Sequence, residues 1–540
     1  MKDEDLFSHD EPTPTASDHE RDSDSDRRAL SSAHAVPQDA PASAHPPKTE
    51  RRRASRYPLR LLLVAMMVVV LVVLAGGYGV FRALSPTARQ ASSAFQQAPC
   101  PFALSGGLVE GKNVKCGFLT VPEDRSQPQG PTIRLAVAIF KTSSPHPAPD
   151  PVLVLGGGPG EAVLETAGPR YYVGNLPSNR DLILLDQRGA GYSQPSLRCF
   201  DNETLQACHA RLVKSGINLN AFTTLENAAD VHDLIRALGY QQVNLEGVSY
   251  GTRLALTVMR LYPADLRSVV LNSVIPPQVN AFTSIPQAAG RAFDVLFQRC
   301  AADRSCNATY PHLQAIFYQL VVELNTTPIT FQAISLFSGV AVTEHFTGND
   351  LVLWVRQALY DTSLIPQLPA VLFQLRQHEY TQLASIYGNG IDIPGSIGLF
   401  YSVMCGEDMA FTTQHALQTS VQGLPPPIQP ALLDFLLSRY SACQLWGVKP
   451  VPAVQKEPVR SSIPTLILQG EYDPVTPPAN GMLAAQTLGK SYFFLFPGVG
   501  HGVSSHISTC PEDITNAFLE NPAEKPDASC ISSMPEPVFT

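Results

Sequence analysis

The chain has 540 residues, of which 44% are hydrophobic and 16% charged, and its formal net charge at pH 7 is −9. This is the composition of a globular protein, and the length fits either several domains or one large α/β fold that carries an insertion. Proteins that bind nucleic acids present a clustered basic surface, which an acidic chain of this kind does not suggest. We therefore expect no nucleic-acid partner.

Residues 1–60 form the first distinct region. They are rich in Asp, Ser and Pro and hold few large apolar side chains. Such a segment cannot bury enough apolar surface to offset the entropy that it would lose on ordering. We predict a disordered, solvated tail here.

Residues 61–81 have the pattern of a transmembrane helix. They contain no charged side chain, and a helix that rises ~1.5 Å per residue would cross the ~30 Å hydrocarbon layer over this length. A cleaved signal peptide has a shorter apolar core and begins at the N-terminus, so we predict an uncleaved anchor. Several arginines precede the span, whereas Arg82 stands nearly alone after it. The positive-inside rule then places the tail in the cytoplasm and everything beyond a linker at 82–99 outside the cell.

The cysteines agree with an exported location. All ten lie between residues 100 and 530, and an even number on the exported side indicates disulfides. None belongs to a Cys-x-x-Cys pair, so a zinc site is poorly supported, and we predict no cofactor or metal. Spacing alone leaves other connectivities open, but proximity in the sequence suggests the pairs Cys100–Cys116, Cys199–Cys208, Cys300–Cys306, Cys405–Cys443 and Cys510–Cys530.

Strand and helix patterns alternate beyond residue 100. Residues 223–239 have the apolar spacing and end signals of a helix. Runs of Val, Ile and Leu typical of buried strands occur within 132–140, 151–160, 180–193, 267–274, 463–470 and 491–498. This alternation predicts an α/β fold with a mostly parallel sheet that is covered on both faces. Residues 276–460 have mainly helical spacing and indicate an inserted helical domain, which leaves 100–275 and 461–540 as the two parts of the core.

A Gly-x-Ser-x-Gly turn lies where a predicted strand meets a helix, with Ser249 between Gly247 and Gly251. The pattern alone is weak, because Gly and Ser are common residues. A serine hydroxyl becomes a useful nucleophile only with a histidine that takes its proton and a carboxylate that orients the histidine. In open α/β sheets such partners gather at the carboxyl ends of the strands.

Two candidate partners follow predicted strands near the C-terminus. Asp473 follows TLILQG by three residues, and His501 follows YFFLFPG. The order Ser249, Asp473, His501 is that of a nucleophile-elbow hydrolase, so we predict a catalytic triad. His506 is a nearby alternative to His501, but it lies further from the end of the strand.

The backbone around the serine supplies the remaining chemistry. A tetrahedral intermediate needs N–H groups aimed at its oxyanion. The residue after the nucleophile, Tyr250, is one predicted donor. The glycine-rich loop 156–160 provides the other, with Gly158 as the first choice and Gly157 as its neighbour.

The motifs GGGPG, LLDQRGAGYS, GVSYGTRLAL, LILQGEYDPVTPP and GVGHG resemble those of serine α/β-hydrolases of the proline iminopeptidase and tripeptidyl aminopeptidase group. The resemblance runs from about Cys100 to Cys530. It implies an α/β-hydrolase fold with a large helical cap and a tripeptidyl-aminopeptidase-like C-terminal region. One departure is Gly156, where many iminopeptidases have His, which bears on the packing of the oxyanion loop.

The resemblance also implies recognition of a free N-terminal amine. The segment SVMCGEDMAF resembles the Cys-x-Glu-Asp stretch of the group and puts Glu407 and Asp408 beside Cys405. A buried carboxylate opposite an ammonium group makes a charge-assisted contact, so we predict that this pair binds the substrate amine. A solvated or salt-bridged pair is the alternative.

The sequence as a whole predicts a membrane-anchored extracellular exopeptidase that acts on peptides with a free N-terminus. An esterase or another acyl hydrolase with the same triad remains an alternative, and a non-catalytic binding protein of the same fold is a less favoured one. The pattern does not say whether one residue or three are removed, or whether proline is preferred, because this depends on how the insertion closes over the site.

Overall fold

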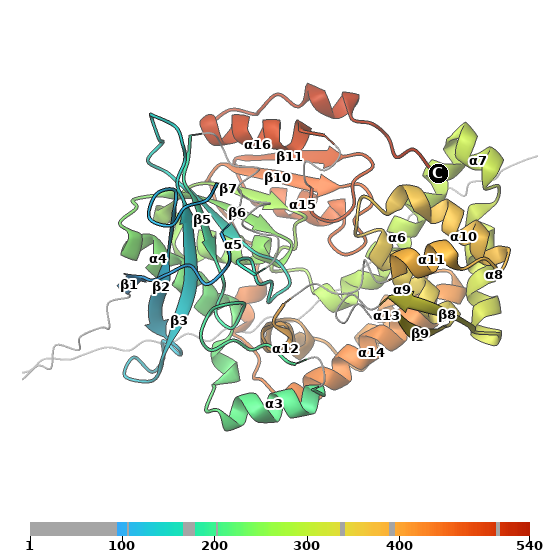
Figure 1. The fold of residues 1–540 in the computed structure, drawn as a ribbon, viewed down its shortest axis with the longest axis horizontal. Helices are drawn as coiled ribbons and strands as arrows, with labels where there is room; N and C mark the ends of the chain where they lie inside the picture. The colour runs from blue at the N-terminus through green and yellow to red at the C-terminus, as the bar shows by residue number, and fades with distance from the viewer. Residues whose placement is uncertain are drawn as a thin grey trace, which may run out of the picture. The chain divides into compact units, whose positions relative to one another are not determined.

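The computed structural model describes residues 94–104, 107–165, 179–200, 203–334, 341–387, 395–503 and 508–539 (Figure 1). The predicted tail and transmembrane span, residues 1–60 and 61–81, lie outside the described residues, as does His506. None of the helices in the described ranges is long and apolar enough to cross a membrane. The anchor therefore stays a prediction.

A nine-stranded sheet forms the core, in the order β1-β2-β3-β5-β4-β6-β7-β10-β11. Its first strands, β1 (Ala94–Gln97), β2 (Val114–Pro122) and β3 (Thr132–Phe140), pair antiparallel, and β3 pairs antiparallel with β5 (Leu182–Leu185). The other strands run parallel to β5 and are β4 (Val152–Leu155), β6 (Val243–Val248), β7 (Leu266–Asn272), β10 (Thr465–Gly470) and β11 (Ser491–Phe496). The predicted mostly parallel sheet is confirmed.

Helices cover both faces of this sheet. On one face lie α4 (Thr224–Leu238), α5 (Tyr250–Leu261) and α15 (Pro478–Ala485), which share an apolar cluster with the strands. On the other face, α16 (Cys510–Glu520) contributes Ile514 and Phe518 to a second cluster. Because both faces are covered, β4, β5 and β10 are buried at every residue, which explains their unbroken apolar runs.

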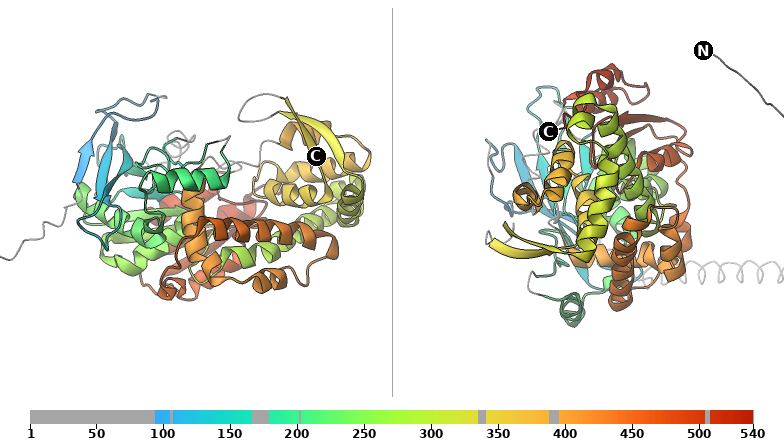
Figure 2. Two further views of the ribbon diagram at one scale, coloured as in Figure 1. Left: turned by 90° about the horizontal axis from the view of Figure 1, so that it is seen from below. Right: turned by 90° about the vertical axis from the view of Figure 1, so that its right-hand side faces the viewer.

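A second group of helices lies between β7 and β10 in the chain, and we call residues 276–460 the cap. It has its own apolar core, to which Phe293, Phe317 and Trp354 belong. Figures 1 and 2 show part of the cap, around α8, α10 and β8–β9, at the end of the body opposite β1–β3. The cap helices are α6 (Ala281–Ala302), α7 (Arg304–Thr309), α8 (Leu313–Thr326), α9 (Gly348–Ala358), α10 (Leu368–Arg376), α11 (Thr381–Ile386), α12 (Ile397–Glu407), α13 (Gln414–Ser420) and α14 (Gln429–Trp446).

The cap also contains an antiparallel hairpin of β8 (Ile329–Ile334) and β9 (Ala341–Phe346). Its apolar residues alternate with polar ones, and Phe331 and Ala333 are buried. The sequence predicted mainly helical structure here. Six residues are too few for periodicity to separate a strand from a turn of buried helix, and pairing with a second strand decides the outcome.

The core and the cap share a further apolar cluster. α3 (Leu205–Lys214), which precedes α4, contributes Leu212, and the cap contributes Leu436 and Trp446. The cap is therefore packed against the core and is not connected to it by the chain alone.

The five disulfides are those that proximity in the sequence suggested. Cys405–Cys443 joins α12 to α14 inside the cap, and Cys510–Cys530 ties the start of α16 to the C-terminal segment. The predicted connectivity is confirmed.

Candidate active site

Ser249 lies between the end of β6 and the start of α5, in a strained turn. Its backbone φ is 56° and its ψ is −122°, a conformation that residues other than glycine rarely adopt. A Cβ atom at Gly247 would collide with the carbonyl oxygen of Gly251, and one at Gly251 would collide with that of Leu155. Only glycine fits both positions, so the motif holds the serine out at the carboxyl edge of the sheet.

Asp473 and His501 meet at the same edge of the sheet. The Asp473 Oδ2 atom lies 2.9 Å from His501 Nδ1, and both side chains are buried. Thr476 donates from its backbone N–H to Asp473 Oδ1 at 2.8 Å and from its hydroxyl to Oδ2 at 2.7 Å. Burial alone would raise the pKa of Asp473, but His501 and the hydrogen bonds from Thr476 outweigh it and hold this pKa below its ordinary value. The carboxylate is thus ionised and oriented toward the imidazole.

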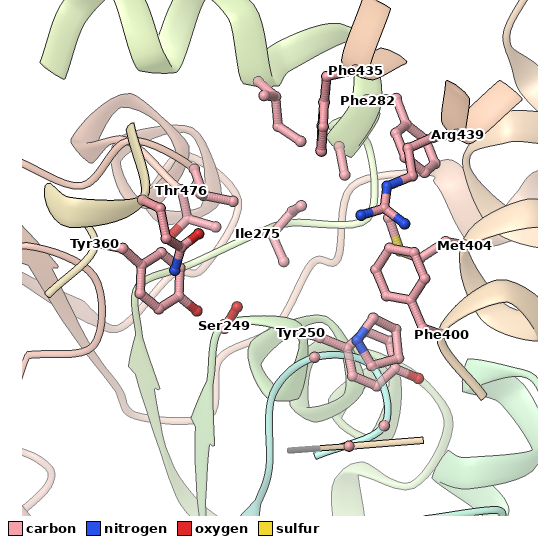
Figure 3. Close-up of a pocket in the computed structure, with 18 of the residues that line it drawn as sticks. Ser249, Tyr250, Ile275, Phe282, Tyr360, Phe400, Met404, Phe435, Arg439 and Thr476 are labelled. Carbon is pink, nitrogen blue, oxygen red and sulfur yellow. The ribbon is translucent and has the colours of Figure 1, made fainter. Parts of the chain in front are cut away.

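The other imidazole nitrogen is available for proton transfer. His501 Nε2 is buried and has no hydrogen-bond partner among the described residues. The ring of Tyr360, which follows α9 in the cap, stacks on the imidazole with centroids 4.1 Å apart. The Tyr360 hydroxyl lies beside Ser249 (Figure 3), and burial raises the pKa of this phenol, which stays neutral. The serine, the tyrosine and the histidine therefore occupy one corner of the site.

The predicted oxyanion donors differ in their surroundings. Tyr250 and Gly158 both line the cavity that contains Ser249. The Gly157 N–H instead donates to Glu161 Oε2 at 2.7 Å. Gly158 and Tyr250 thus line the cavity beside the serine, and their part as oxyanion donors stays a prediction.

The cavity has a volume of about 450 Å³ and lies between the core and the cap. This falls within the range of ~300–1,000 Å³ found for small-molecule sites. Most of its wall is apolar and aromatic, and Figure 3 shows Phe282, Phe400 and Phe435 around it. The cavity is suited to a short, partly apolar ligand.

Glu407 and Asp408 do not line this cavity. The two oxygens of Glu407 accept from the backbone N–H of Thr224 at 2.6 Å and from its hydroxyl at 2.7 Å. Asp408 forms buried ion pairs with Arg253 at 2.7 Å and with Lys456 at 2.5 Å. These contacts connect the cap to helices α4 and α5 of the core, so both carboxylates have a structural role. Their predicted binding of a substrate amine is untested and stays a prediction.

Three residues of the site were not singled out from the sequence. Thr476 lies three residues after Asp473, so a search for turn residues around the carboxylate could have found it. Glu161 directly follows the glycine-rich loop and is a carboxylate on the cavity. Tyr360 carries no local signal, because it reaches the site only through the packing of the cap.

Two protein families match the sequence. The family described as the alpha/beta hydrolase fold matches residues 150–326, and the family described as TAP-like protein matches residues 429–530. The first match contains Ser249, and the second contains Asp473 and His501.

Several curated proteins are similar along much of the chain. It is 23% identical to putative hydrolase YuaR of Escherichia coli, over 77% of this chain and 88% of that protein. It is 24% identical to serine protease Hip1 of Mycobacterium tuberculosis, over 85% of this chain and 95% of that protein. It is 30% identical to the tripeptidyl aminopeptidase of Streptomyces lividans, over 31% of this chain and 36% of that protein.

The fold, the elbow serine and these similarities define a serine hydrolase of the peptidase type. The two family matches and these relatives support an α/β-hydrolase of the tripeptidyl aminopeptidase and proline iminopeptidase group.

Proposed function

We propose that this protein is a membrane-anchored extracellular serine exopeptidase that releases residues or short peptides from free N-termini. The observation that carries the proposal is the pairing of Asp473 with His501 beside the cavity that contains Ser249. The names of the similar proteins, a serine protease and a tripeptidyl aminopeptidase, support a peptide substrate.

The geometry supports one assignment of roles. Ser249 attacks the scissile carbonyl while His501 Nε2 takes its proton, and Asp473 holds the Nδ1–H and stabilises the imidazolium. The backbone N–H groups of Tyr250 and Gly158 receive the oxyanion. His501 then protonates the leaving amine, and water attacks the acyl-enzyme with the same histidine as base.

The hydrogen bond between Ser249 and His501 forms in this proposal only when substrate is bound. In the structure, His501 Nε2 has no partner in the described part of the chain, and the serine lies beside the Tyr360 hydroxyl. Catalytic hydrogen bonds are often long or misaligned without substrate and tighten in the complex, so in this proposal substrate binding brings the serine hydroxyl to His501 Nε2.

The cap supports cleavage near a chain end. Cap residues such as Trp354 and Phe435 form one side of the cavity, and core residues form the other. A cavity of about 450 Å³ accommodates a few residues of an extended peptide. Because the cap covers one side of the cavity, we expect a chain end to enter it more readily than a folded protein or the middle of a long chain.

Profiling of the full-length protein in detergent tests the activity. The substrates are aminoacyl and tripeptidyl arylamides with free or acetylated amines, together with a matched arylester. We expect the free-amine arylamides to be turned over at least ~10-fold faster than the acetylated ones. Turnover of the ester without turnover of any arylamide would instead identify an esterase.

The Ser249→Ala variant is the control for this profile. It should lose at least ~10³-fold in kcat on every substrate and should not react with a fluorophosphonate probe. If the wild-type serine also fails to react with the probe, the protein is a non-catalytic binding protein and the proposal is wrong.

The anchor is tested separately. Residues 61–81 support it by their length and lack of charge. We expect the protein in the membrane fraction, resistant to extraction with high salt, and cleaved by protease added to intact cells. Deletion of residues 61–81 should release it, and a full-length protein that is soluble without detergent would contradict the proposal.

A further inference from the structure

The charged side chains on the cavity form no ion pairs with one another within the described residues. Its two acidic groups accept hydrogen bonds from neutral donors in their own segments: Glu161 accepts from the Gly157 N–H, and Asp350 accepts from the N–H and hydroxyl of Thr347. One arginine is neutralised, since Arg253 pairs with Asp408. The cavity's charged lining residues are Glu161, Arg253, Asp350, Arg356 and Arg439, so two arginines remain.

Arg356, on α9, has no ion pair or hydrogen bond with any residue that the structure describes. Its Nε atom is buried and unpaired, and its guanidinium lies 5.3 Å from the centroid of the Phe435 ring. Burial, with a smaller contribution from the charge of Arg439, lowers the pKa of Arg356 to about 10. The group stays protonated at neutral pH, and no carboxylate of the described residues pairs with it directly.

Arg439, on α14, approaches the same aromatic ring. Its guanidinium lies 5.2 Å from the Phe435 centroid. One nitrogen donates to the Tyr401 hydroxyl at 2.7 Å, and no carboxylate pairs with it among the described residues. Figure 3 shows this guanidinium pointing into the cavity from the wall opposite Ser249 and Tyr360. Phe435 therefore holds two arginines in one part of the cavity.

This arrangement is costly without an anion. Two like charges that share a partly buried, aromatic setting repel each other, and stacking on rings compensates only part of the lost hydration. Each guanidinium still has N–H donors that are free within the described part of the chain. A carboxylate accepts such paired donors in a fork-like geometry, which makes short and strong contacts.

We propose that Arg356 and Arg439 form a subsite that binds a carboxylate of the peptide substrate. The subsite rests on the proposed peptidase function and adds a preference that neither the fold nor the triad requires. Both arginines line the cavity that contains Ser249, and Tyr360, which stacks on His501, lines it as well, so the bound carboxylate lies in the same cavity as the scissile bond. The carboxylate is either an acidic side chain or the free C-terminus of a short peptide.

Matched substrates test the preference and separate its two sources. One series compares Glu with Gln at each of the three residues next to the scissile bond. A second series compares short peptides that end in a free acid with the same peptides as amides. In at least one pair, we expect wild-type kcat/KM to favour the acid by ~10–100-fold. Preference in the first series identifies the side chain, and preference in the second identifies the terminus. Equal rates in every pair overturn the proposal.

Two variants connect the preference to these residues. Arg356→Met and Arg439→Met remove the charge and keep much of the side-chain volume. Each should reduce the acid-to-neutral ratio toward 1, while kcat/KM on the neutral member stays within ~3-fold. Arg376→Met is the matched control, because Arg376 is exposed on α10, and its ratio should equal that of the wild type. A ratio that both cavity variants leave unchanged contradicts the proposal.

A binding measurement separates this inference from the proposed activity. In the Ser249→Ala variant, calorimetry with the preferred peptide pair should give a Kd for the acid that is ~10–100-fold lower than for its neutral isostere. Addition of Arg356→Met should abolish this difference. If the acid binds selectively but the wild-type enzyme cleaves no peptide, the subsite stands and the peptidase proposal fails. If peptides are cleaved but bind without regard to charge, the subsite is wrong and the peptidase stands.

Discussion

The two sides of the cavity are built in different ways. On the core side, Ser249, Asp473 and His501 each follow the carboxyl end of a strand, and the backbone itself fixes their positions. On the cap side, long side chains such as Arg356 and Phe435 project from helices and are held by packing alone. The residues proposed for the chemistry are thus placed by local backbone geometry, whereas the residues proposed to select the substrate are placed by contacts between distant segments. The following predictions test this division, beginning with the largest effect.

Removal of the charge from the core carboxylate should have the largest effect. Asp473→Asn leaves the size of the side chain nearly unchanged but no longer stabilises the imidazolium or enforces the Nδ1–H tautomer. We expect kcat to fall by ~10³–10⁴, measured with the best arylamide substrate, and circular dichroism to show an unchanged fold. Asp434→Asn, at an exposed position on α14, is the control. A loss of less than tenfold would exclude Asp473 as the orienting carboxylate.

Loss of the ion pair between the cap and the core should destabilise the protein. Asp408→Asn removes the charge that pairs with Arg253 and Lys456 and leaves the buried Arg253 and the partly buried Lys456 without this counter-ion. We expect the free energy of unfolding to fall by ~3–5 kcal/mol, measured by urea titration at pH 7. If unfolding at pH 7 is unchanged, the cap is held by its apolar contacts alone.

The same pair has a defined pH dependence. Burial would raise the pKa of Asp408, but Arg253 and Lys456 outweigh it and lower this pKa below its ordinary value. The stability that this group contributes is therefore present above the unfolded-state pKa of ~3.9 and is lost as the pH falls through the folded-state value. Asp408→Asn should lack this part of the acid-induced loss, and its difference from the wild type should shrink below pH 4.

Tyr360 tests whether the cap also contributes to the chemistry. Tyr360→Ala removes the ring that stacks on His501, so the imidazole loses one of its supports, and we expect kcat to fall by ~10–100-fold. Tyr360→Phe keeps the ring and removes only the hydroxyl beside Ser249, so its kcat should fall by less than tenfold. Equal losses in the two variants would show that the hydroxyl, and not the stacking, is the important group.

The smallest effect is expected at Glu407. Its oxygens are bonded to Thr224 and do not face the cavity, so Glu407→Gln should change kcat/KM on free-amine and acetylated substrates by the same factor, within ~3-fold. Glu161→Gln is the matched comparison, because Glu161 is a carboxylate on the cavity wall. A selective loss on free-amine substrates in Glu407→Gln would instead confirm the amine-binding role predicted from the sequence.

Much of the core could be predicted from the sequence because its signals are local. The buried strands appear in the sequence as unbroken apolar runs. The turn at Ser249 has no room for a side chain at residues 247 and 251, so the two glycines of the motif mark it in the sequence. The disulfide pairs also followed from proximity, since Cys300 and Cys306, for example, belong to helices that are adjacent in the chain.

The cap could be predicted only as a mainly helical insertion. The hairpin β8–β9 depends on pairing between strands that are too short to identify one at a time. The position of Tyr360 over His501 joins residues 141 apart in the sequence, and no local pattern encodes such a contact. The same holds for the contacts of Glu407 and Asp408. The sequence of two acidic residues near a cysteine is the same whether their side chains contact a ligand or a neighbouring helix.

The backbone of the catalytic loop is fastened to the cap. The His501 N–H donates to the Tyr360 carbonyl at 2.9 Å, and the Gly500 N–H donates to the Thr362 hydroxyl at 3.0 Å. If the cap moved away from the core, these two hydrogen bonds would break and His501, the proposed proton acceptor, would lose its position. The position of the proposed general base therefore depends on contacts with the cap, and any displacement of the cap should lower the activity.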